Sequence, residues 1–376
     1  MQQQWISATY QVPWQEHLLD RAQQIAVGMT VGSWNDLPAV RQTHLRKFLG
    51  EAGPVTQHGQ HGHFVVRYPV DNFAPSMASL LTVIFGKLSL DGPIRLVELE
   101  LPPAFVEQFG GPAYGIAGLR RTLNVWHRPL VMSIFKSENG RSLPEFLVAF
   151  DEQISGGVDL VKDDEIYFYD KDAPLIERAA RTREALDTRE ARTGQKGFYA
   201  ANLAATPSSL LETAWTAFEL GVQAFLVSPY AMGLDTLVDL RKHGPPAVLI
   251  AHPAFAGGLV APHRFGLAPH ILFGQLARLA GADMVLYPSP YGSVAMDSHD
   301  ALAVAQALTQ PAAYAGAWPG PSAGVHAEML PRLHQDFGTD LVINAGGAIH
   351  GHPQGTRAGA AHLVEAMHRE WEGGGS

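Results

Sequence analysis

The 376-residue chain contains no cysteine, so disulfide bridges, thiol nucleophiles and cysteine-ligated zinc sites are excluded. Basic residues are also scarce: 27 lysines and arginines stand against 36 aspartates and glutamates, a formal net charge of -9. Nucleic acids and anionic membranes attract basic surfaces, so the sequence predicts neither as a partner. Long apolar runs are missing too. Proline, glycine and histidine interrupt the most apolar stretch, residues 245–262, and no membrane span is expected.

Charged residues are few, at 17% of the chain, whereas hydrophobic residues reach 46%. Disordered chains show the opposite balance, so the sequence predicts a folded protein with a sizeable core. The opening residues, MQQQWISATYQVPW, show neither the basic nor the apolar region of a secretory signal peptide. We therefore expect a cytoplasmic protein. Local groups must hold any anionic small ligand, because the overall charge repels it.

Residues 1–118 predict a smaller α+β domain of ferredoxin-like type. Some of its stretches alternate apolar and polar residues, as half-buried strands do, and others repeat apolar residues at helical spacing. The expected strands are residues 5–10, 63–70 and 94–101, and the expected helices are residues 17–27 and 76–85. We expect these strands to form an antiparallel sheet.

Within residues 119–376, short apolar runs alternate with amphipathic segments of helical length. The runs are residues 129–135, 156–161, 197–202, 222–228, 246–251, 282–288, 314–319 and 340–345. Near-continuous apolar strands separated by helices are typical of a parallel sheet covered on both faces. Eight such units over about 230 residues favour an α/β fold with a (β/α)8 (TIM) barrel over an open doubly wound sheet. The active site of such a barrel lies at the carboxyl ends of its strands.

The segment 156–165, GGVDLVKDDE, has the most specific chemical pattern, because an apolar strand runs directly into a lysine and three carboxylates. The alternation of side chains along a strand points Lys162 and Asp164 the same way, with Glu165 turning in at the strand end. Carboxylate oxygens suit a hard cation such as Mg²⁺. A buried lysine can lose its proton and react, and uptake of CO2 would turn it into an anionic oxygen ligand. A solvated charge run after a strand remains the alternative.

Two glycine-containing loops could hold a phosphate. Gly346 and Gly347 follow the last predicted strand, and Ser322 and Gly324 follow the strand before it. Glycine allows backbone N–H groups to point at an anion, and the loops after strands seven and eight of a barrel commonly form a phosphate site. Ordinary glycine-rich turns remain the alternative.

Several single side chains have both a functional and a structural interpretation. Lys87 lies in an apolar, glycine-containing turn, where desolvation suits a general base, but it could also be a surface lysine at a helix end. His252 follows an apolar strand, where it could act in acid–base catalysis or polarise a ligand. Alternatively, it is a structural histidine whose ring nitrogens are hydrogen-bonded within the fold. Trp34 either packs over a ligand or lies in a core. Lys136 and Asn202 end predicted barrel strands.

Together, these segments resemble the RuBisCO large-subunit superfamily. Residues 156–165 are similar to its GG-x-D-x-x-KDDE activation motif, and residues 346–355 are similar to its late phosphate segment. The resemblance implies that Lys162 is a carbamylated lysine (N6-carboxylysine) and that Asp164 and Glu165 are the other Mg²⁺ ligands. It also implies substrate and phosphate contacts from a further set of residues. These are Asn202, His252, Ser322, Gly324, Gly346 and Gly347.

The chain departs from the carboxylating members of that superfamily at three positions. Those members carry a mobile lysine in the loop after strand six, and residues 289–294 contain none. They place an arginine for a second phosphate where this chain has Pro253, and a glutamate near the position of Gly28. The resemblance therefore implies an enzyme that is not a carboxylase.

Five segments resemble one RuBisCO-like group, the 2,3-diketo-5-methylthiopentyl-1-phosphate enolases of methionine salvage. They are residues 28–38, 85–92, 131–136, 287–295 and 343–353. This resemblance implies a keto–enol isomerase with Lys87 as general base and Lys136 as a substrate contact or alternative base. It further implies a homodimer in which the N-terminal domain closes the barrel of its partner. A sugar-phosphate isomerase and a non-catalytic binding protein remain alternatives, and either Pro269 or His270 fills the family's histidine position.

Overall fold

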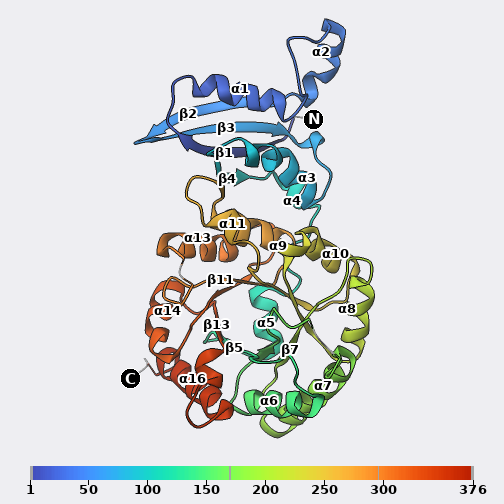
Figure 1. The fold of residues 1–376 in the computed structure, drawn as a ribbon, viewed down its shortest axis with the longest axis vertical. Coiled ribbons are helices and arrows are strands. Elements are labelled where there is room, and N and C mark those ends of the chain that lie inside the picture. The colour runs from blue at the N-terminus through green and yellow to red at the C-terminus, as the bar shows by residue number, and fades with distance from the viewer. Residues whose placement is uncertain (1–2, 169–170, 295, 374–376) are drawn as a thin grey trace.

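The computed structural model describes residues 3–168, 171–294 and 296–373; residue 295, the last of the segment 287–295, lies outside them. Figure 1 shows a smaller N-terminal part, built on one sheet, above a ring of strands and helices that forms the larger part. None of the helices in these described ranges combines the length and apolarity needed to cross a bilayer.

The N-terminal sheet has the order β10-β4-β1-β3-β2. Its strands are β1 Trp5–Pro13, β2 Glu51–His58, β3 His61–Pro69, β4 Arg95–Glu100 and β10 Gly266–Leu267. Every second residue of β1 is buried, as expected for a strand with one face on a core. The first four strands pair antiparallel, whereas β10 comes from the barrel part of the chain and pairs parallel with β4.

The expected N-terminal strands and helices are confirmed, and the sequence analysis missed four of the helices and strands named here. The helices here are α1 Leu18–Gly28, α2 Ala39–Leu45, α3 Met77–Leu81 with a π-helical turn Thr82–Gly86, and α4 Pro103–Val106. The missed elements are β2, α2, α4 and β10. The strand β2 has the sequence EAGPVTQH, and most of its residues are exposed, so it shows no apolar alternation.

The larger part is an eight-stranded parallel barrel, and all eight predicted strands are confirmed. The strands are β5 Leu130–Ile134, β6 Leu160–Lys162, β7 Phe198–Asn202, β8 Ala224–Val227, β9 Val248–Ala251, β11 Met284–Pro288, β12 Trp318–Ser322 and β13 Val342–Ala345. The last strand, β13, pairs with the first, β5. A hydrogen bond of 2.8 Å from Asn344 Nδ2 to Ser322 Oγ joins β13 to β12, the two ends of the strand order.

One barrel strand lies further along the chain than expected. The apolar run 314–319 predicts the seventh strand, but β12 begins at Trp318 and has the sequence WPGPS. Proline and glycine disfavour strands, so the pattern pointed to the preceding residues instead. The preceding residues, 314–317, make other contacts instead of joining the strand. The guanidinium of Arg278 stacks on Tyr314, and the Gly316 carbonyl accepts a hydrogen bond from Ile116 N.

The larger part contains a set of helices, most of which surround the barrel on its outer side (Figure 1). They are α5 Gly115–Leu123, α6 Leu143–Ser155, α7 Leu175–Thr193, α8 Leu210–Glu219, α9 Pro229–Met232, α10 Asp235–His243, α11 Gly257–Val260, α12 Ala277–Leu279 after a π-helical segment His270–Leu276, α13 Ser298–Thr309, α14 Leu330–Phe337, α15 Gly347–His350 and α16 Thr356–Trp371. The helix α5 lies within the ring of strands in the view of Figure 1. The predicted domain boundary between residues 118 and 119 falls within α5, and this division of the chain stays a prediction.

The barrel strands alternate between two apolar cores. Leu160, Phe198 and Val248 belong to a cluster that fills the barrel interior. Their neighbours Val161, Tyr199 and Leu249 belong to the larger cluster that includes buried residues of the surrounding helices. Because side chains alternate along a strand, the residue two positions after an interior residue also faces inward. This rule fixes which residues at the strand ends face the barrel mouth.

Candidate active site

Lys162 is the last residue of β6 and faces the barrel interior, two positions after Leu160. Its side chain is fully buried, and Nζ donates a hydrogen bond of 2.9 Å to the carbonyl of Asp163. Burial lowers the pKa of the Lys162 amine, although the carboxylates of Glu165 and Asp164 oppose this shift. A buried amine with a lowered pKa is the form of lysine that can act as a nucleophile.

Asp163 points away from the barrel interior and is anchored there. Its carboxylate accepts hydrogen bonds from Arg178 Nη1 at 2.7 Å, from Tyr199 OH at 2.6 Å and from the backbone N–H of Asn202 at 3.0 Å. The guanidinium of Arg178 lies 4.7 Å from the ring centre of Tyr167, a cation–π contact. These bonds fix the chain direction immediately after Lys162, so Asp164 and Glu165 turn toward the barrel mouth.

Lys136 holds the side chain of Asp164. Lys136 follows β5, the strand beside β6, and its Nζ donates a hydrogen bond of 2.7 Å to Asp164 Oδ2. Gly346 makes room for Lys136, because a Cβ atom at Gly346 would lie 3.0 Å from Lys136 Cε and 3.3 Å from Ile134 Cβ. The structure thus brings three predicted site residues from three strands together.

Glu165 lies close to both Lys162 and His252. Glu165 Oε2 is 3.6 Å from Lys162 Nζ and 3.3 Å from His252 Nε2. Burial raises the pKa of Glu165, but Lys162 and a backbone hydrogen bond outweigh that effect and leave the pKa lowered. Burial, reinforced by Lys162, lowers the pKa of His252 to about 3, so this imidazole is neutral. Its Nδ1 accepts from Ala254 N at 3.1 Å, which leaves the proton on Nε2, facing Glu165.

The donor set fits a metal ion only if Lys162 is modified. Within the described ranges, no three histidine, aspartate or glutamate side chains are gathered so that they could hold a metal ion. Asp164 and Glu165 supply two carboxylates beside Lys162. An unmodified ammonium repels a cation, whereas an N-carboxylated Lys162 would add a third anionic oxygen of the kind that Mg²⁺ prefers.

The predicted phosphate loops lie at the ends of neighbouring strands. Ser322 is the last residue of β12, and its hydroxyl donates to Gly320 O while it accepts from Asn344 Nδ2. Gly324 has φ +87°, the left-handed region that favours glycine, and a Cβ atom there would lie 3.1 Å from Ser293 N. Gly346 and Gly347 connect β13 to α15. The bond between Asn344 and Ser322 holds the ends of β12 and β13 close together. The role of the two following loops as phosphate contacts stays a prediction.

Lys87 and Trp34 lie apart from this group within one chain. Lys87 is exposed at the end of a helical turn, which agrees with the surface-lysine alternative, and it lines a hollow of about 650 Å³. The other residues that line this hollow fall within positions 15–29 and 88–91, all in the N-terminal part. Trp34 is half-buried, in a bend between α1 and α2. A single chain therefore does not bring Lys87 to Lys162.

Asn202 and His270 have different surroundings. Asn202 ends β7, and its Nδ2 donates to Tyr167 O at 3.0 Å and to Glu165 O at 3.4 Å, so it braces the loop that carries Glu165. His270 begins a π-helical segment, and the groups that act on it come from β4 and α13, among them Arg95 and Asp300. The geometry thus groups Asn202, but not His270, with the predicted metal ligands.

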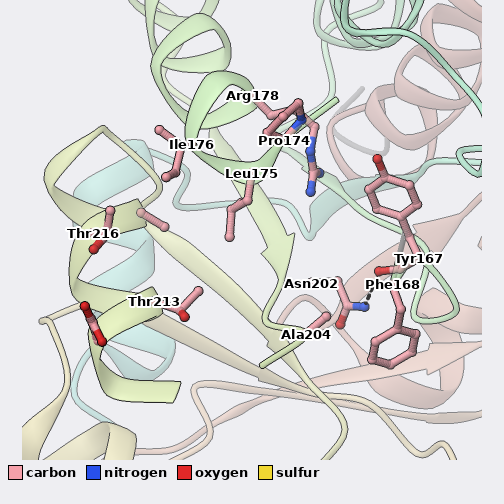
Figure 2. Close-up of a pocket in the computed structure, with 12 residues that line it drawn as sticks. Tyr167, Phe168, Pro174, Leu175, Ile176, Arg178, Asn202, Ala204, Thr213 and Thr216 are labelled. Carbon is pink, nitrogen blue, oxygen red and sulfur yellow. Dashed lines mark hydrogen bonds between the residues drawn. The ribbon is translucent and has the colours of Figure 1, made fainter. Parts of the chain in front are cut away.

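A cavity of about 310 Å³ flanks the candidate site. Figure 2 shows Leu175 and Ile176 of α7 beside Thr213 and Thr216 of α8, with the bond from Asn202 to Tyr167 dashed. Asn202 lines this cavity and also donates to the carbonyl of Glu165, so the cavity borders the loop that carries Glu165. The cavity lies between two outer helices, so it adjoins the group around Lys162 rather than containing it.

Sequence reasoning missed Glu138, a buried carboxyl two residues after Lys136. Its side chain is 3% exposed, and Oε2 accepts the backbone N–H of Asp164 at 2.5 Å. Burial, followed by the charge of Asp163, raises the pKa of Glu138 to about 10. The segment SENGRS reads as an ordinary polar turn, so the sequence holds no signal that this glutamate is buried.

Comparisons with known proteins show which family the sequence resembles. Residues 115–374 match the family model described as the ribulose bisphosphate carboxylase large chain, catalytic domain. A 2,3-diketo-5-methylthiopentyl-1-phosphate enolase of Exiguobacterium sibiricum is 42% identical over 364 residues, which cover 96% of this chain and 92% of that relative. The enolase of that name from Geobacillus thermodenitrificans is 43% identical, with 96% and 91% covered.

Solved structures show the same relationship. A rubisco-like protein (MtnW) from Alicyclobacillus acidocaldarius has a TM-score of 0.91 at 42% identity, covering 98% of this chain and 95% of that one. The octameric Rubisco of Pyrococcus horikoshii has a TM-score of 0.90 at 26% identity, with 98% and 88% covered. The two-part fold with its eight-stranded barrel is therefore a Rubisco-like fold, and the chain belongs to the RuBisCO large-chain family.

Proposed function

We propose that the chain is a 2,3-diketo-5-methylthiopentyl-1-phosphate enolase of methionine salvage. As an isomerase, it would convert this phosphorylated diketone to 2-hydroxy-3-keto-5-methylthiopentenyl-1-phosphate. One observation carries the proposal: Lys162, Asp164 and Glu165 converge at the barrel mouth of a chain that is 42% identical to a relative of that name. Cytoplasmic location is part of the proposal, because methionine salvage acts on small phosphorylated metabolites.

The proposed cofactor is Mg²⁺, held by Asp164, Glu165 and a carbamate on Lys162. In forming the carbamate, Lys162 Nζ attacks the carbon of CO2 and loses one proton to solvent, so the amine becomes an anionic oxygen ligand. The lowered pKa of Lys162 favours this step, because only the neutral amine is a nucleophile. Once bound, Mg²⁺ would supply Lewis-acid stabilisation of negative charge on the substrate oxygens.

The chain's own residues would orient the substrate and move one proton. The loops that contain Ser322, Gly324, Gly346 and Gly347 would hold the single phosphate and keep C1 aligned. A base removes a proton from C1, the electrons of that C–H bond form the C1=C2 double bond, and the C2 carbonyl oxygen gains a proton. The proposed base is Lys87, with Lys136 next to the substrate oxygens. His252 is neutral, so its Nε2–H can donate a hydrogen bond to the substrate.

Lys87 can be this base only if a second chain supplies it. In the chain described here Lys87 lines a hollow formed by N-terminal residues alone. We therefore include a homodimer with shared active sites in the proposal. In such a C2 dimer the N-terminal domain of each subunit covers the barrel mouth of its partner.

Proton exchange at C1 tests the base assignment. Lys87→Ala should lower turnover and deuterium exchange at C1 together, by about 10²–10⁴-fold, as is typical when a general base is removed. Binding of substrate in the presence of Mg²⁺ should change little, because the phosphate loops and metal ligands remain. Exchange at the wild-type rate would exclude Lys87, and Lys136→Ala should then abolish exchange instead.

A further inference from the structure

The hairpin formed by β2 and β3 carries three histidines on one face. His58 ends β2, and both His61 and His63 belong to β3. The strand register places His58 directly opposite His61, and Thr56 directly opposite His63. Residues two positions apart on a strand share a face, so all three imidazoles lie on the same side of the hairpin. In Figure 1 the end of this hairpin projects at the left of the N-terminal part.

Gly62 determines which way the histidine face points. Gly62 lies between the two histidines of β3 and is buried, and a Cβ atom there would lie 2.2 Å from Leu18 Cδ1 of α1. The Gly62 side of the hairpin therefore packs on α1, and the histidines point to the opposite side of the sheet. The tip is also anchored, because Trp14 N donates a hydrogen bond of 2.8 Å to Gln60 O.

Two of the three rings already lie side by side. The ring centres of His58 and His63 are 4.9 Å apart. His58 Nε2 is 3.2 Å from the hydroxyl of Thr56, so this nitrogen lies level with His63 on the facing strand. His63 Nε2 is buried, and in the part of the chain that the structure describes it has no hydrogen-bond partner. A buried polar atom of this kind calls for a water molecule or an ion beside it.

His61 is placed to become the third ligand. Directly opposite residues of an antiparallel pair have Cβ atoms about 4.5–5.5 Å apart, so His61 starts within reach of His58. Within the described ranges no three potential ligands already enclose one point, so the His61 ring has to rotate toward the other two. His61 is exposed, and exposed side chains change rotamer freely on the picosecond to nanosecond timescale.

We propose that His58, His61 and His63 form a binding site for a divalent d-block cation, with Zn²⁺ as its ligand. Imidazole nitrogen suits zinc, copper and nickel, whereas Mg²⁺ prefers oxygen ligands. Three imidazoles and one water complete a four-coordinate zinc ion, as in carbonic anhydrase. The bound ion would fasten β2, the edge strand of the sheet, to β3. The site is separate from the group around Lys162 and does not rest on the proposed function.

Zinc calorimetry on the full-length protein tests this site. Saturating Mg²⁺ is present throughout, so that oxygen ligands elsewhere are occupied. The wild type should bind Zn²⁺ at micromolar concentrations. His58→Asn, His61→Asn and His63→Asn should each lower the affinity by roughly 10-fold or more, because losing a ligand costs at least as much as losing a residue behind one. The matched control is His299→Asn, which removes an exposed histidine of α13 and should leave zinc affinity unchanged.

Thermal unfolding provides a second measurement on the same proteins. Zn²⁺ should raise the unfolding temperature of the wild type and of His299→Asn, since a ligand that binds only the folded state stabilises it. It should raise the unfolding temperature of the three hairpin variants less. His58 and His61 are exposed, so their variants keep the proposal testable if the half-buried His63 cannot be replaced without unfolding.

Two results would overturn the proposal. Saturation of the wild type only at millimolar Zn²⁺ would mean an adventitious ion only. Wild-type zinc affinity in His58→Asn or in His61→Asn would mean that the three imidazoles do not act together. Neither measurement uses substrate or turnover, so failure of the zinc site and failure of the proposed enolase function are distinguishable.

Discussion

At the scale of single residues, buried aspartates paired with arginines fix the ends of several barrel strands. Asp283 is fully buried, pairs with Arg241 at 2.6 Å and accepts the backbone N–H groups of Tyr114, Gly115 and Leu249. It therefore joins α5, α10 and the strand β9 at one point. Its loss would remove the acceptor of three backbone N–H groups and leave the guanidinium of Arg241 with only the carbonyls of Gly281 and Ala247.

We expect Asp283→Ala to lower the free energy of unfolding by about 3–5 kcal/mol, as when one partner of a buried ion pair is removed. Urea unfolding monitored by circular dichroism measures this. The matched control is Asp187→Ala, which removes an exposed pair with Arg183 and should cost about 0–1 kcal/mol. Equal effects of the two substitutions would contradict the role given to Asp283.

A second prediction at this scale concerns the modification of Lys162. Activity should rise when the protein is incubated with bicarbonate and Mg²⁺ together before the assay. Lys162→Ala should lose Mg²⁺ affinity as well as turnover, because the carbamate ligand cannot form. The control is Lys196→Ala, a change at a half-exposed lysine in the turn before β7. Full wild-type activity after thorough removal of CO2 would argue against the carbamate.

Where a strand ends in polar residues, the sequence predicts which side chains lie close together in space. Lys162, Asp164 and Glu165 follow an apolar run, and the rule that active sites lie at the carboxyl ends of barrel strands groups them correctly. The burial of Glu138 could not be predicted, because it depends on how the loop after β5 folds onto β6. For Lys87 the sequence left a desolvated base and a surface lysine open, and one chain leaves this lysine exposed.

At the scale of elements, the loops after β11 and β12 are packed directly on each other. Ser293 N donates to Ala323 O at 3.0 Å, and Ser289 N donates to Ser322 O at 2.8 Å. A Cβ atom at Gly292 would lie 1.7 Å from Ala323 O, so only glycine permits this contact. The predicted phosphate loop therefore depends on the shape of its neighbour.

We expect Gly292→Ala to separate these two loops and raise the KM for a phosphorylated substrate by roughly 10-fold, the loss of about one charge-assisted hydrogen bond. The control is Gly258→Ala, since a Cβ atom at that position meets nothing within 4 Å. Steady-state kinetics and a thermal unfolding scan compare the two variants. An unchanged KM in Gly292→Ala would show that the two loops do not depend on each other.

Elements were predictable where their apolar pattern is regular. Eight barrel strands follow from near-continuous apolar runs, because both faces of each strand are covered. The strand β2 was not predictable, since its exposed residues show no alternation of apolar and polar side chains. The strand β12 was predicted too early in the chain, because Pro319 and Pro321 are residues that disfavour strands. The two-residue strand β10 is formed only by its pairing with β4, a contact between residues 95 and 266 that no local pattern encodes.

At the scale of the whole molecule, the contacts that tie the N-terminal part to its own barrel include three that lie near Lys87 in the chain or on the sheet. β10 pairs with β4, Gln275 Nε2 donates to Leu99 O at 2.8 Å, and the Asp235 carboxylate caps α3 by accepting from Met77 N and Ala78 N at 2.8 Å each. These contacts hold Lys87 in its own hollow. The proposed catalysis therefore requires the Lys87 of one subunit to meet the Lys162 of another.

Hybrid dimers test this arrangement. Lys87→Ala and Lys162→Ala should each be inactive alone, because every site lacks one essential lysine. In a hybrid dimer one site combines the intact Lys162 of the first variant with the intact Lys87 of the second. Random exchange makes about half of the dimers hybrid, each with one intact site of two, so about a quarter of wild-type activity should return.

The control pairs two variants whose altered residues both belong to the barrel. Mixing Lys162→Ala with Asp164→Ala should restore nothing, since each barrel then lacks one of its own metal ligands in every combination. Native mass spectrometry establishes that the subunits have exchanged. If Lys87→Ala and Lys162→Ala regain no activity after proven exchange, each chain must build its site alone. Lys136, which already contacts Asp164 within one chain, would then be the group positioned to take the proton from C1.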